Sequence, residues 1–256
     1  MLLKTNKEGL SDYLRSFEYP EGIVVSVKRK FIYLKPPKTA GTSILRHFLQ
    51  KEVPDIIHQK DNPTAFNQWL KDITDAELYT YFIFTVVRNP WERFLSTATY
   101  FGTNLSDFIN NFEKYNTSID IKNHLRELYK YSKFRDNNFC DFIGRMENLQ
   151  VDMNIVCDEI GVQKQILPFK NVSRDISKHY SLSYRRKKHI SFVFERYGRD
   201  IELFGYSFID VNQQQAQLKD ITRKQKLKSI KKRIRKYLKF LGVFSIMSKR
   251  NNSILI

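Results

Sequence analysis

Cysteine is scarce in this chain, which has only Cys140 and Cys157 among 256 residues. Two thiols are too few for the cross-linked framework of a small secreted domain, and they form no Cys-based zinc motif. We therefore expect a reducing compartment. The N-terminal sequence MLLKTNKEGLSDYLRSF lacks the apolar run of a signal peptide, and no stretch of about 18 apolar residues offers a membrane span. These absences predict a cytoplasmic protein.

Glycine and proline are also sparse, with 9 and 7 residues. They form no flexible linker, and no internal repeat is visible. The chain therefore divides only by composition. It has a polar lead-in at residues 1–26, a globular body at 27–210 and a basic tail at 211–256.

Acidic residues are outnumbered by Lys and Arg, 27 to 44, which gives a net charge of +17. Such a surplus predicts an anionic partner: nucleic acid, acidic polysaccharide, anionic lipid or a polyphosphorylated small molecule. The tail holds 13 basic residues and one acidic residue, so residues 1–210 carry only +5. Hydrophobic residues at 41% and aromatics at 14% exclude a disordered or collagen-like chain. The body is thus a mildly basic domain with enough residues for a sizeable core.

Short apolar runs alternate with helical patterns along the body. Residues 31–34 (FIYL) and 81–87 (YFIFTVV) predict buried strands, and 139–143 predict a third. Helices are expected over residues 43–49, 90–101, 146–160 and 184–197, with Pro90 in a first turn and Gly161 as a C-terminal cap. The helix at 146–160 places Leu149, Met153, Val156, Cys157 and Ile160 on one face. This alternation favours an α/β fold with a central, mainly parallel sheet flanked by helices.

The segment Lys35-Pro-Pro-Lys-Thr-Ala-Gly-Thr-Ser43 joins the first predicted strand to the first helix. Small and hydroxyl residues at a helix N-terminus offer free backbone N–H groups and favour an anion, most often phosphate. Lys38 adds a cation. The lysine precedes Gly41, so this is not a Walker A loop, and an ATPase or GTPase is disfavoured. The alternative is an ordinary strand-to-helix turn with Thr42 or Ser43 as N-cap.

The segment Arg88-Asn-Pro-Trp-Glu-Arg-Phe-Leu-Ser96 follows the second predicted strand. Arg88 lies at the carboxyl end of that strand, where α/β proteins bind ligands. Ser96 falls about two helical turns further along, and an Arg with a hydroxyl suits a second phosphate. The alternative is that Arg88 and Arg93 are structural and that Ser96 is solvated.

Together these segments resemble the sulfotransferase family, which uses the sulfuryl donor PAPS. Pro37 to Ser43 matches the family's donor-binding loop in order, and Val87, Arg88, Asn89, Pro90 and Ser96 match its second element. Residues 141–149 (DFIGRMENL) and 195–206 (ERYGRDIELFGY) are similar to segments of the carbohydrate-type branch. The resemblance runs from about residue 30 to 207 and implies a P-loop-like three-layer fold in a bacterial-like enzyme.

The resemblance also implies roles for individual residues. Lys38 and the loop residues Thr39, Ala40, Gly41, Thr42 and Ser43 would hold the 5′-phosphosulfate, and Arg88 and Ser96 the 3′-phosphate. The reaction would be in-line transfer of a sulfuryl group from PAPS to a carbohydrate hydroxyl on a polysaccharide or glycolipid, with release of PAP. Lys38 would stabilise the charge on the leaving phosphate oxygen, so no metal is required. Residues 170–173 (KNVS) are expected to close over the donor.

A base is needed for the acceptor hydroxyl, and a histidine suits the role. His58 lies between the two donor segments, where heparan-type and bacterial members of the family carry a catalytic histidine. We therefore assign the base to His58, with His124 second. An exposed loop histidine is the alternative for His58. Asp55, Asp61 and Glu92 remain other possible bases, His47 is expected to pack in its helix, and His179 and His189 receive no role.

The basic tail combines an apolar stripe with a cationic face over residues 218–241. Three roles stay open: contact with an anionic inner membrane surface, packing or oligomer contact, and binding of an anionic acceptor. The oligomeric state is unknown. A nucleic-acid partner is not expected, because no helix-turn-helix, zinc finger or aromatic RNA-binding motif is present. For the whole protein, the alternative is a non-catalytic nucleotide- or polyanion-binding protein on the same fold.

Overall fold

The computed structural model describes residues 5–16, 22–134, 137–167 and 179–209. The chain divides into two compact units, residues 1–208 and 209–256. The predicted tail at 211–256 and the KNVS segment at 170–173 lie outside the described residues, so their roles stay predictions. All the described helices and strands belong to the first unit.

A five-stranded sheet forms the centre of this unit, in the order β3-β1-β2-β4-β7. Its strands are β1 (Ile23–Ser26), β2 (Phe31–Leu34), β3 (Ile56–His58), β4 (Phe82–Val87) and β7 (Phe142–Arg145). The pairs β2–β4 and β4–β7 are parallel, whereas β1 runs antiparallel to both of its neighbours. A separate two-stranded ribbon joins β5 (Lys133–Phe134) to β6 (Asn137–Asn138).

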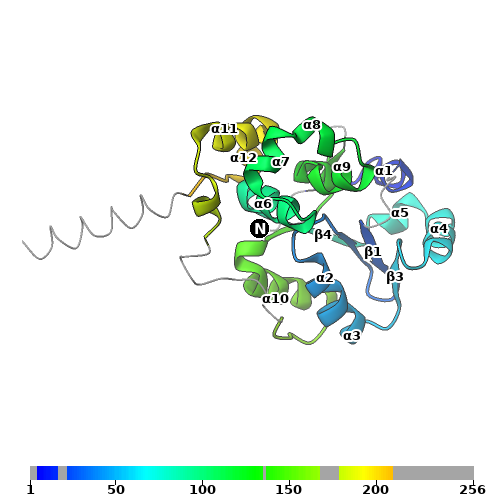
Figure 1. Ribbon diagram of the computed structural model, residues 1–256. Helices are drawn as coiled ribbons and strands as arrows, with labels where there is room; N and C mark the ends of the chain where they lie inside the picture. The colour runs from blue at the N-terminus through cyan, green and yellow to red at the C-terminus, as the bar shows by residue number, and fades with distance from the viewer. Residues whose placement is uncertain (1–4, 17–21, 135–136, 168–178, 210–256) are drawn as a thin grey trace, which may run out of the picture. The chain divides into compact units, whose positions relative to one another are not determined.

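The strands bury side chains on both faces, as the continuous apolar runs predicted. On one face, Ile32 and Leu34 pack with α1 (Leu10–Ser16), α4 (Pro63–Asp72) and α5 (Asp75–Leu78). On the other face, Phe31 and Tyr33 pack against the helices after β2 and against α10 (Leu149–Ile160). Alternation along each strand sends successive side chains to opposite faces. Figure 1 shows the second group of helices along the lower side of the sheet.

A third apolar cluster is helical. It gathers α6 (Pro90–Tyr100), α7 (Leu105–Asn110), α8 (Phe112–Tyr115), α9 (Ile119–Leu125), α11 (Lys187–Arg196) and α12 (Gly198–Phe204). Phe94 of α6 lies at its centre, with Phe108 at 5.3 Å and Phe192 at 5.8 Å between ring centroids. Short 3₁₀ turns, η2 (Leu128–Tyr131), η3 (Met146–Asn148) and η5 (Tyr180–Ser183), connect these layers.

The structure confirms the predicted fold class, an α/β fold with a mainly parallel sheet flanked by helices. The strands predicted at 31–34 and 81–87 are β2 and β4, and Pro90 begins α6. All five residues predicted on one face of α10 are buried, and Gly161 caps it at φ 65°. The helix predicted at 43–49 is a continuous helical segment of α2 (Gly41–Ile44), η1 (Leu45–Leu49) and α3 (Gln50–Glu52).

Three expectations differ from the structure. The strand expected at 139–143 begins at Phe142, and the helix expected at 184–197 begins at Lys187. Residues 1–26, expected to form a helix or an ordered lead-in, contain the helix α1, but they also contribute the strand β1 to the sheet. The sheet therefore begins before residue 27.

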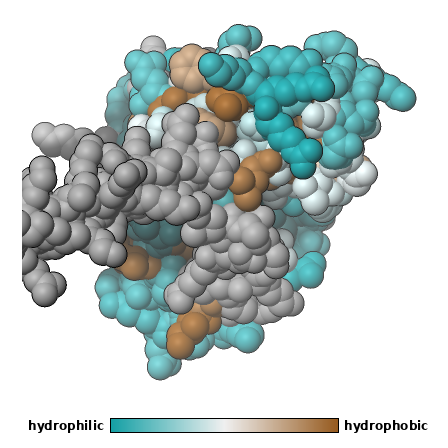
Figure 2. Space-filling view, turned by 60° about the vertical axis from the view of Figure 1, so that its left-hand side comes forward, coloured by the Kyte–Doolittle hydropathy of each residue, from teal (hydrophilic) through white to brown (hydrophobic). Residues whose placement is uncertain are grey.

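The described surface is mostly polar. In the view of Figure 2, brown apolar residues are scattered among teal ones. Large exposed apolar side chains come from separate elements, among them Tyr79, Ile119, Val151 and Phe194. Within the described residues, no helix has the length and apolar character needed to cross a membrane.

Candidate active site

A pocket of about 480 Å³ opens at the carboxyl ends of the parallel strands. Its wall takes residues from the loops after β2 and β4, from η3 after β7, and from β3. This is where open α/β sheets bind ligands, because several loops meet at one edge. The lining residues that bear on function are Lys35, Lys38, Ala40, Gly41, Thr42, Ser43, Arg46, His58, Lys60, Asp61, Arg88, Ser96, Tyr100 and His124.

The loop after β2 takes an unusual backbone path. Lys38 and Ala40 have φ values of 65° and 63°, in the left-handed region that non-glycine residues rarely occupy. Thr39 is buried between them, and its hydroxyl donates to the Pro36 carbonyl at 2.9 Å. Strained conformations of this kind cluster at functional sites. A Cβ on Gly41 would stand 2.8 Å from the Lys35 Cγ, so glycine fits this close approach.

The helix that follows begins at Gly41, with Ala40 as its N-cap and no side-chain cap. This finding contradicts the alternative in which Thr42 or Ser43 is the N-cap of a plain turn. The first intrahelical bond runs from the Ile44 N–H to the Ala40 carbonyl at 3.0 Å. The N–H groups of Gly41, Thr42 and Ser43 therefore precede the helical ladder and can bind an anion in the pocket.

Lys38 also lines the pocket. Its Nζ is 4.2 Å from the centroid of the Tyr100 ring. Burial lowers the pKa of Lys38, and the neighbouring Arg88 lowers it further. Within the described residues this ammonium makes no ion pair, so its charge is available to an anion.

Arg88 bridges the two loops. Its Nη1 donates to the Lys38 carbonyl at 3.0 Å, and its Nη2 pairs with Glu92 at 2.9 Å. The Nε–H is buried and has no hydrogen-bond partner among the described residues. Ser96 lies on α6 two turns after Arg88 and lines the same pocket. Arg93 is 1% exposed and stacks on the Tyr197 ring at 5.1 Å, as the structural alternative expects, whereas Arg88 has structural partners and also lines the pocket.

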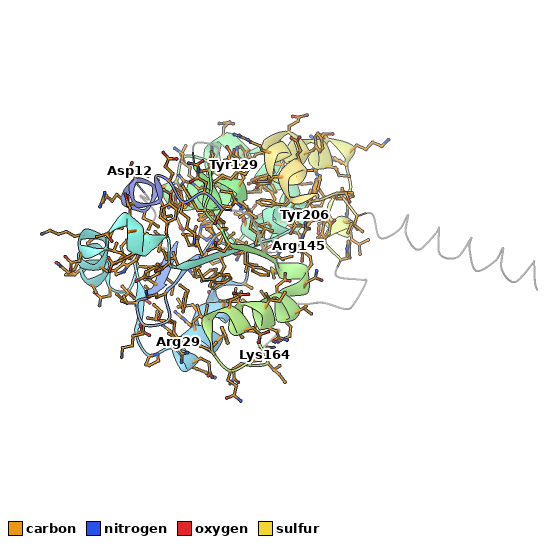
Figure 3. All side chains as sticks on the ribbon, turned by 180° about the vertical axis from the view of Figure 1, so that it is seen from behind. Asp12, Arg29, Tyr129, Arg145, Lys164 and Tyr206 are labelled. Carbon is orange, nitrogen blue, oxygen red and sulfur yellow. The ribbon has the colours of Figure 1, made fainter. Side chains whose placement is uncertain are left out.

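The loop that carries Arg88 is held from outside the pocket. The Asn89 side chain caps α6 by accepting from the N–H groups of Trp91 and Glu92 at 3.1 and 3.3 Å. The Asn89 N–H donates to Glu147 at 2.6 Å, and Glu147 also accepts from the Tyr206 hydroxyl at 3.1 Å. Figure 3 shows Arg145 beside Tyr206, with the guanidinium 4.8 Å from the ring centroid.

His58 ends β3 and lines the pocket. It is 6% exposed, which contradicts the alternative of an exposed loop histidine. Its Nδ1 lies 2.8 Å from Asp61 Oδ2, and this hydrogen bond lowers the pKa of Asp61. An ionised carboxylate only accepts, so Nδ1 carries a hydrogen, and in the neutral imidazole Nε2 is then an acceptor. Nε2 is buried without a hydrogen-bond partner in the described part of the chain.

The other acid–base candidates are placed differently. His124 lines the pocket and is 6% exposed, with Nδ1 at 2.9 Å from the Asp120 carbonyl. Asp55 accepts from the Ser26 hydroxyl and the Lys28 N–H, and it is absent from the described pocket wall. Glu92 is engaged by Arg88.

The three remaining histidines support no catalytic assignment. His179 bonds Ser181, and His189 is buried in α11. His47 lies in η1, and its side chain is outside the described part of the structure.

The structure thus brings most of the predicted site residues into one pocket. The predicted residues that line it are Lys38, Ala40, Gly41, Thr42, Ser43, His58, Arg88 and Ser96. Thr39 of the same loop is buried and is not part of the described wall. Sequence reasoning missed Tyr100 and three cations of the wall, Lys35, Arg46 and Lys60. The signal for Tyr100 was available, because it follows Ser96 by one helical turn and shares its face. Among the described side chains, no three His, Cys, Asp or Glu residues gather as a metal site.

Comparison with known proteins gives one match. Residues 21–207 match the sequence profile described as "Sulfotransferase family". The match covers both donor segments, the pocket and the segments around Glu147 and Tyr206. No curated protein and no solved structure matches the chain.

Proposed function

The chain belongs to the sulfotransferase family, and we propose that it transfers a sulfuryl group from PAPS to a hydroxyl of a carbohydrate acceptor. The single observation that carries the proposal is the convergence in one pocket of Lys38, Arg88 and His58. Members of this family are transferases that typically use PAPS. The carbohydrate acceptor is supported by the likeness of residues 141–149 and 195–206 to the carbohydrate-type branch.

The pocket residues fit a donor with two phosphate positions. The N–H groups of the 41–43 turn and the Lys38 ammonium suit the 5′-phosphosulfate. The Arg88 guanidinium, whose Nε–H has no hydrogen-bond partner among the described residues, and the Ser96 hydroxyl suit the 3′-phosphate. Two buried polar atoms, Arg88 Nε and His58 Nε2, lack hydrogen-bond partners in the described residues, and a polar ligand would provide them.

The roles of the residues follow from charge. When bound, PAPS supplies a sulfuryl group attached to a phosphate oxygen. His58 Nε2 accepts the proton of the acceptor hydroxyl as the hydroxyl oxygen bonds to sulfur and the bond from sulfur to the phosphate oxygen breaks. Lys38 and the N–H groups of the loop neutralise the charge that develops on that oxygen. Asp61 holds the His58 ring in the tautomer with Nε2 free.

The donor site is tested by comparing PAP with 5′-AMP, which lacks the 3′-phosphate. The wild-type protein should bind PAP more tightly, and Lys38→Ala should weaken PAP binding. Equal affinities for PAP and AMP would overturn the assignment of the two phosphate positions.

The base is tested by a matched pair of variants, His58→Asn and His124→Asn. His58→Asn should lower kcat by about 10²- to 10⁴-fold with little change in PAP affinity. A large loss in His124→Asn alone would move the base to His124.

The acceptor is tested by screening labelled PAPS against polysaccharides, glycolipids, phenols and tyrosine peptides. Transfer to a carbohydrate supports the proposal, and transfer confined to the non-carbohydrate acceptors overturns it. Tight PAP binding with no transfer to any acceptor would favour a non-catalytic nucleotide-binding role.

A further inference from the structure

We propose that Tyr100 is a positioning residue that holds the Lys38 ammonium in place through the face of its ring. Lys38 Nζ lies 4.2 Å from the ring centroid, within the range of a cation–π interaction. The consequence for catalysis rests on the proposed role of Lys38 at the donor phosphate. The contact itself does not depend on that role.

The Lys38 ammonium needs such a contact. It is half-buried, and the Arg88 guanidinium adjoins it, so both desolvation and repulsion disfavour its charged form. Within the described residues, no carboxylate pairs with it, and Glu92 is engaged by Arg88 instead. The negative face of an aromatic ring partly offsets this desolvation and repulsion, and it does so without an anion bound to the ammonium. Lys38 can then still bind a phosphate oxygen.

The ring is held in turn by α9. Tyr100 is 59% exposed, yet the His124 ring stacks on it with centroids 5.0 Å apart and an interplanar angle of 18°. Phe101 meets both rings edge-on, at 5.1 Å from each. The Nδ1 of His124 lies 2.9 Å from the Asp120 carbonyl in its own helix. The position of Lys38 is therefore linked through Tyr100 to α9, the element that also contributes His124 to the pocket.

Two variants separate the ring from the hydroxyl. Tyr100→Phe keeps the aromatic face, and Tyr100→Leu keeps apolar bulk without it. Tyr79→Leu, at an exposed tyrosine outside the pocket wall, is the matched control. A partly exposed cation–π contact predicts that Tyr100→Leu weakens PAP binding by roughly 3- to 5-fold, whereas Tyr100→Phe should bind PAP within about 1.5-fold of the wild type.

A spectroscopic signature reports the contact without any donor. Reductive ¹³C-methylation keeps the lysine charge, and Lys38→Arg identifies the Lys38 methyl signal by its loss. This signal should be displaced by the ring current in the wild type and in Tyr100→Phe, and it should return to the position of exposed lysines in Tyr100→Leu. An unchanged signal in Tyr100→Leu overturns the proposal.

A double-mutant cycle completes the test. In a Lys38→Met background, Tyr100→Leu should cause no further loss of PAP affinity, because the ring then has no ammonium to hold. A loss that persists in that background would mean that Tyr100 acts on the ligand directly. If the wild type binds no PAP while the methyl signal behaves as expected, the proposed function fails and the role of Tyr100 stands.

Discussion

A substitution of Arg88 gives the sharpest test of the donor site, because the guanidinium carries a positive charge and also presents its N–H donors in a fixed plane. Two of its nitrogens bind the Lys38 carbonyl and Glu92, at 3.0 and 2.9 Å. The Nε–H has no hydrogen-bond partner in the described residues, and each terminal nitrogen carries a second N–H. Arg88→Lys retains the charge but cannot present three donors in a plane. The substitution therefore separates the contribution of the planar N–H donors to PAP binding from that of the positive charge.

The expected loss follows from the hydrogen bonds. The lysine must give up at least one hydrogen bond to a charged group, each of which contributes about 1.5–3 kcal/mol. Since about 1.4 kcal/mol corresponds to a tenfold change, PAP affinity should fall roughly 10- to 150-fold. Because 5′-AMP carries no 3′-phosphate, its affinity should fall by less than about threefold.

Titration calorimetry with PAP and 5′-AMP measures both losses on the same protein. Arg199→Lys is a suitable control, because its guanidinium lies 4.6 Å from the Tyr129 ring and outside the described pocket wall. Equal losses for the two nucleotides would refute the reasoning. They would mean that Arg88 acts by holding the loop through the Lys38 carbonyl rather than by binding the 3′-phosphate.

Other consequences can be tested with single substitutions. Asp61→Asn should lower kcat by roughly tenfold or more at unchanged PAP affinity, because an amide no longer enforces the productive tautomer of His58. The bond to His58 lowers the pKa of Asp61 below its ordinary 3.8, so its stabilisation is present above pH 3.8 and is lost as pH falls through the lowered pKa. Urea midpoints of wild type and Asp61→Asn should differ at pH 6 and converge in acid. Lys7→Met should lower the free energy of unfolding by about 3 kcal/mol, since the Asp141 carboxylate loses the ammonium that lies 2.9 Å from it. Lys71→Met, at an exposed position in α4, should leave the urea midpoint unchanged.

Strands with apolar residues throughout were the easiest elements to predict. In β2 and β4, every residue but Phe82 is buried, because helices cover both faces of the parallel region. The strand β7 begins later than the predicted residue 139 because of a polar side chain. The Asp141 carboxylate accepts from the Ile83 N–H at 2.8 Å and pairs with Lys7. The Asp141 N–H still donates to the Ile83 carbonyl at 2.7 Å, but the Ile83 N–H bonds the carboxylate in place of a backbone carbonyl, and the regular ladder begins at Phe142.

The strand β1 was missed because its sequence pattern is too short. Its four residues are all buried, yet a run of this length has too few positions to distinguish a strand from the apolar face of a helix. It pairs with β2 across the turn at residues 27–30 and with β3, which follows only after the donor loop and its helix. Its place in the sheet is therefore set by these two pairings and not by its own pattern.

Chemistry in the site was predictable where a residue type and a strand end coincide. Arg88 directly follows β4, Lys38 lies in the loop that follows β2, and His58 also proves to end a strand. The hydrogen bond between His58 and Asp61 spans only three residues, but nothing in the sequence distinguishes it from a pair of solvated side chains. The stacking of Tyr100 on His124 depends on how α6 and α9 pack, which is a property of the whole helical cluster.

Two residues of the segments 141–149 and 195–206 act from outside the pocket, although Met146 and Leu149 of the first segment line it. They are Glu147 and Tyr206, and neither is part of the described pocket wall. Glu147 accepts from the Asn89 N–H and from the Tyr206 hydroxyl, and the Asn89 amide also donates to the Ser207 carbonyl at 3.2 Å. Asn89 stands directly between Arg88 and the first turn of α6, so one junction sets the position of Arg88 and the direction of the helix that carries Ser96. The sheet fixes the end of β4, and the hydrogen bonds to Asn89 fix the turn that follows it. These bonds therefore keep the Arg88 guanidinium and the Ser96 hydroxyl, two helical turns apart, at the same pocket.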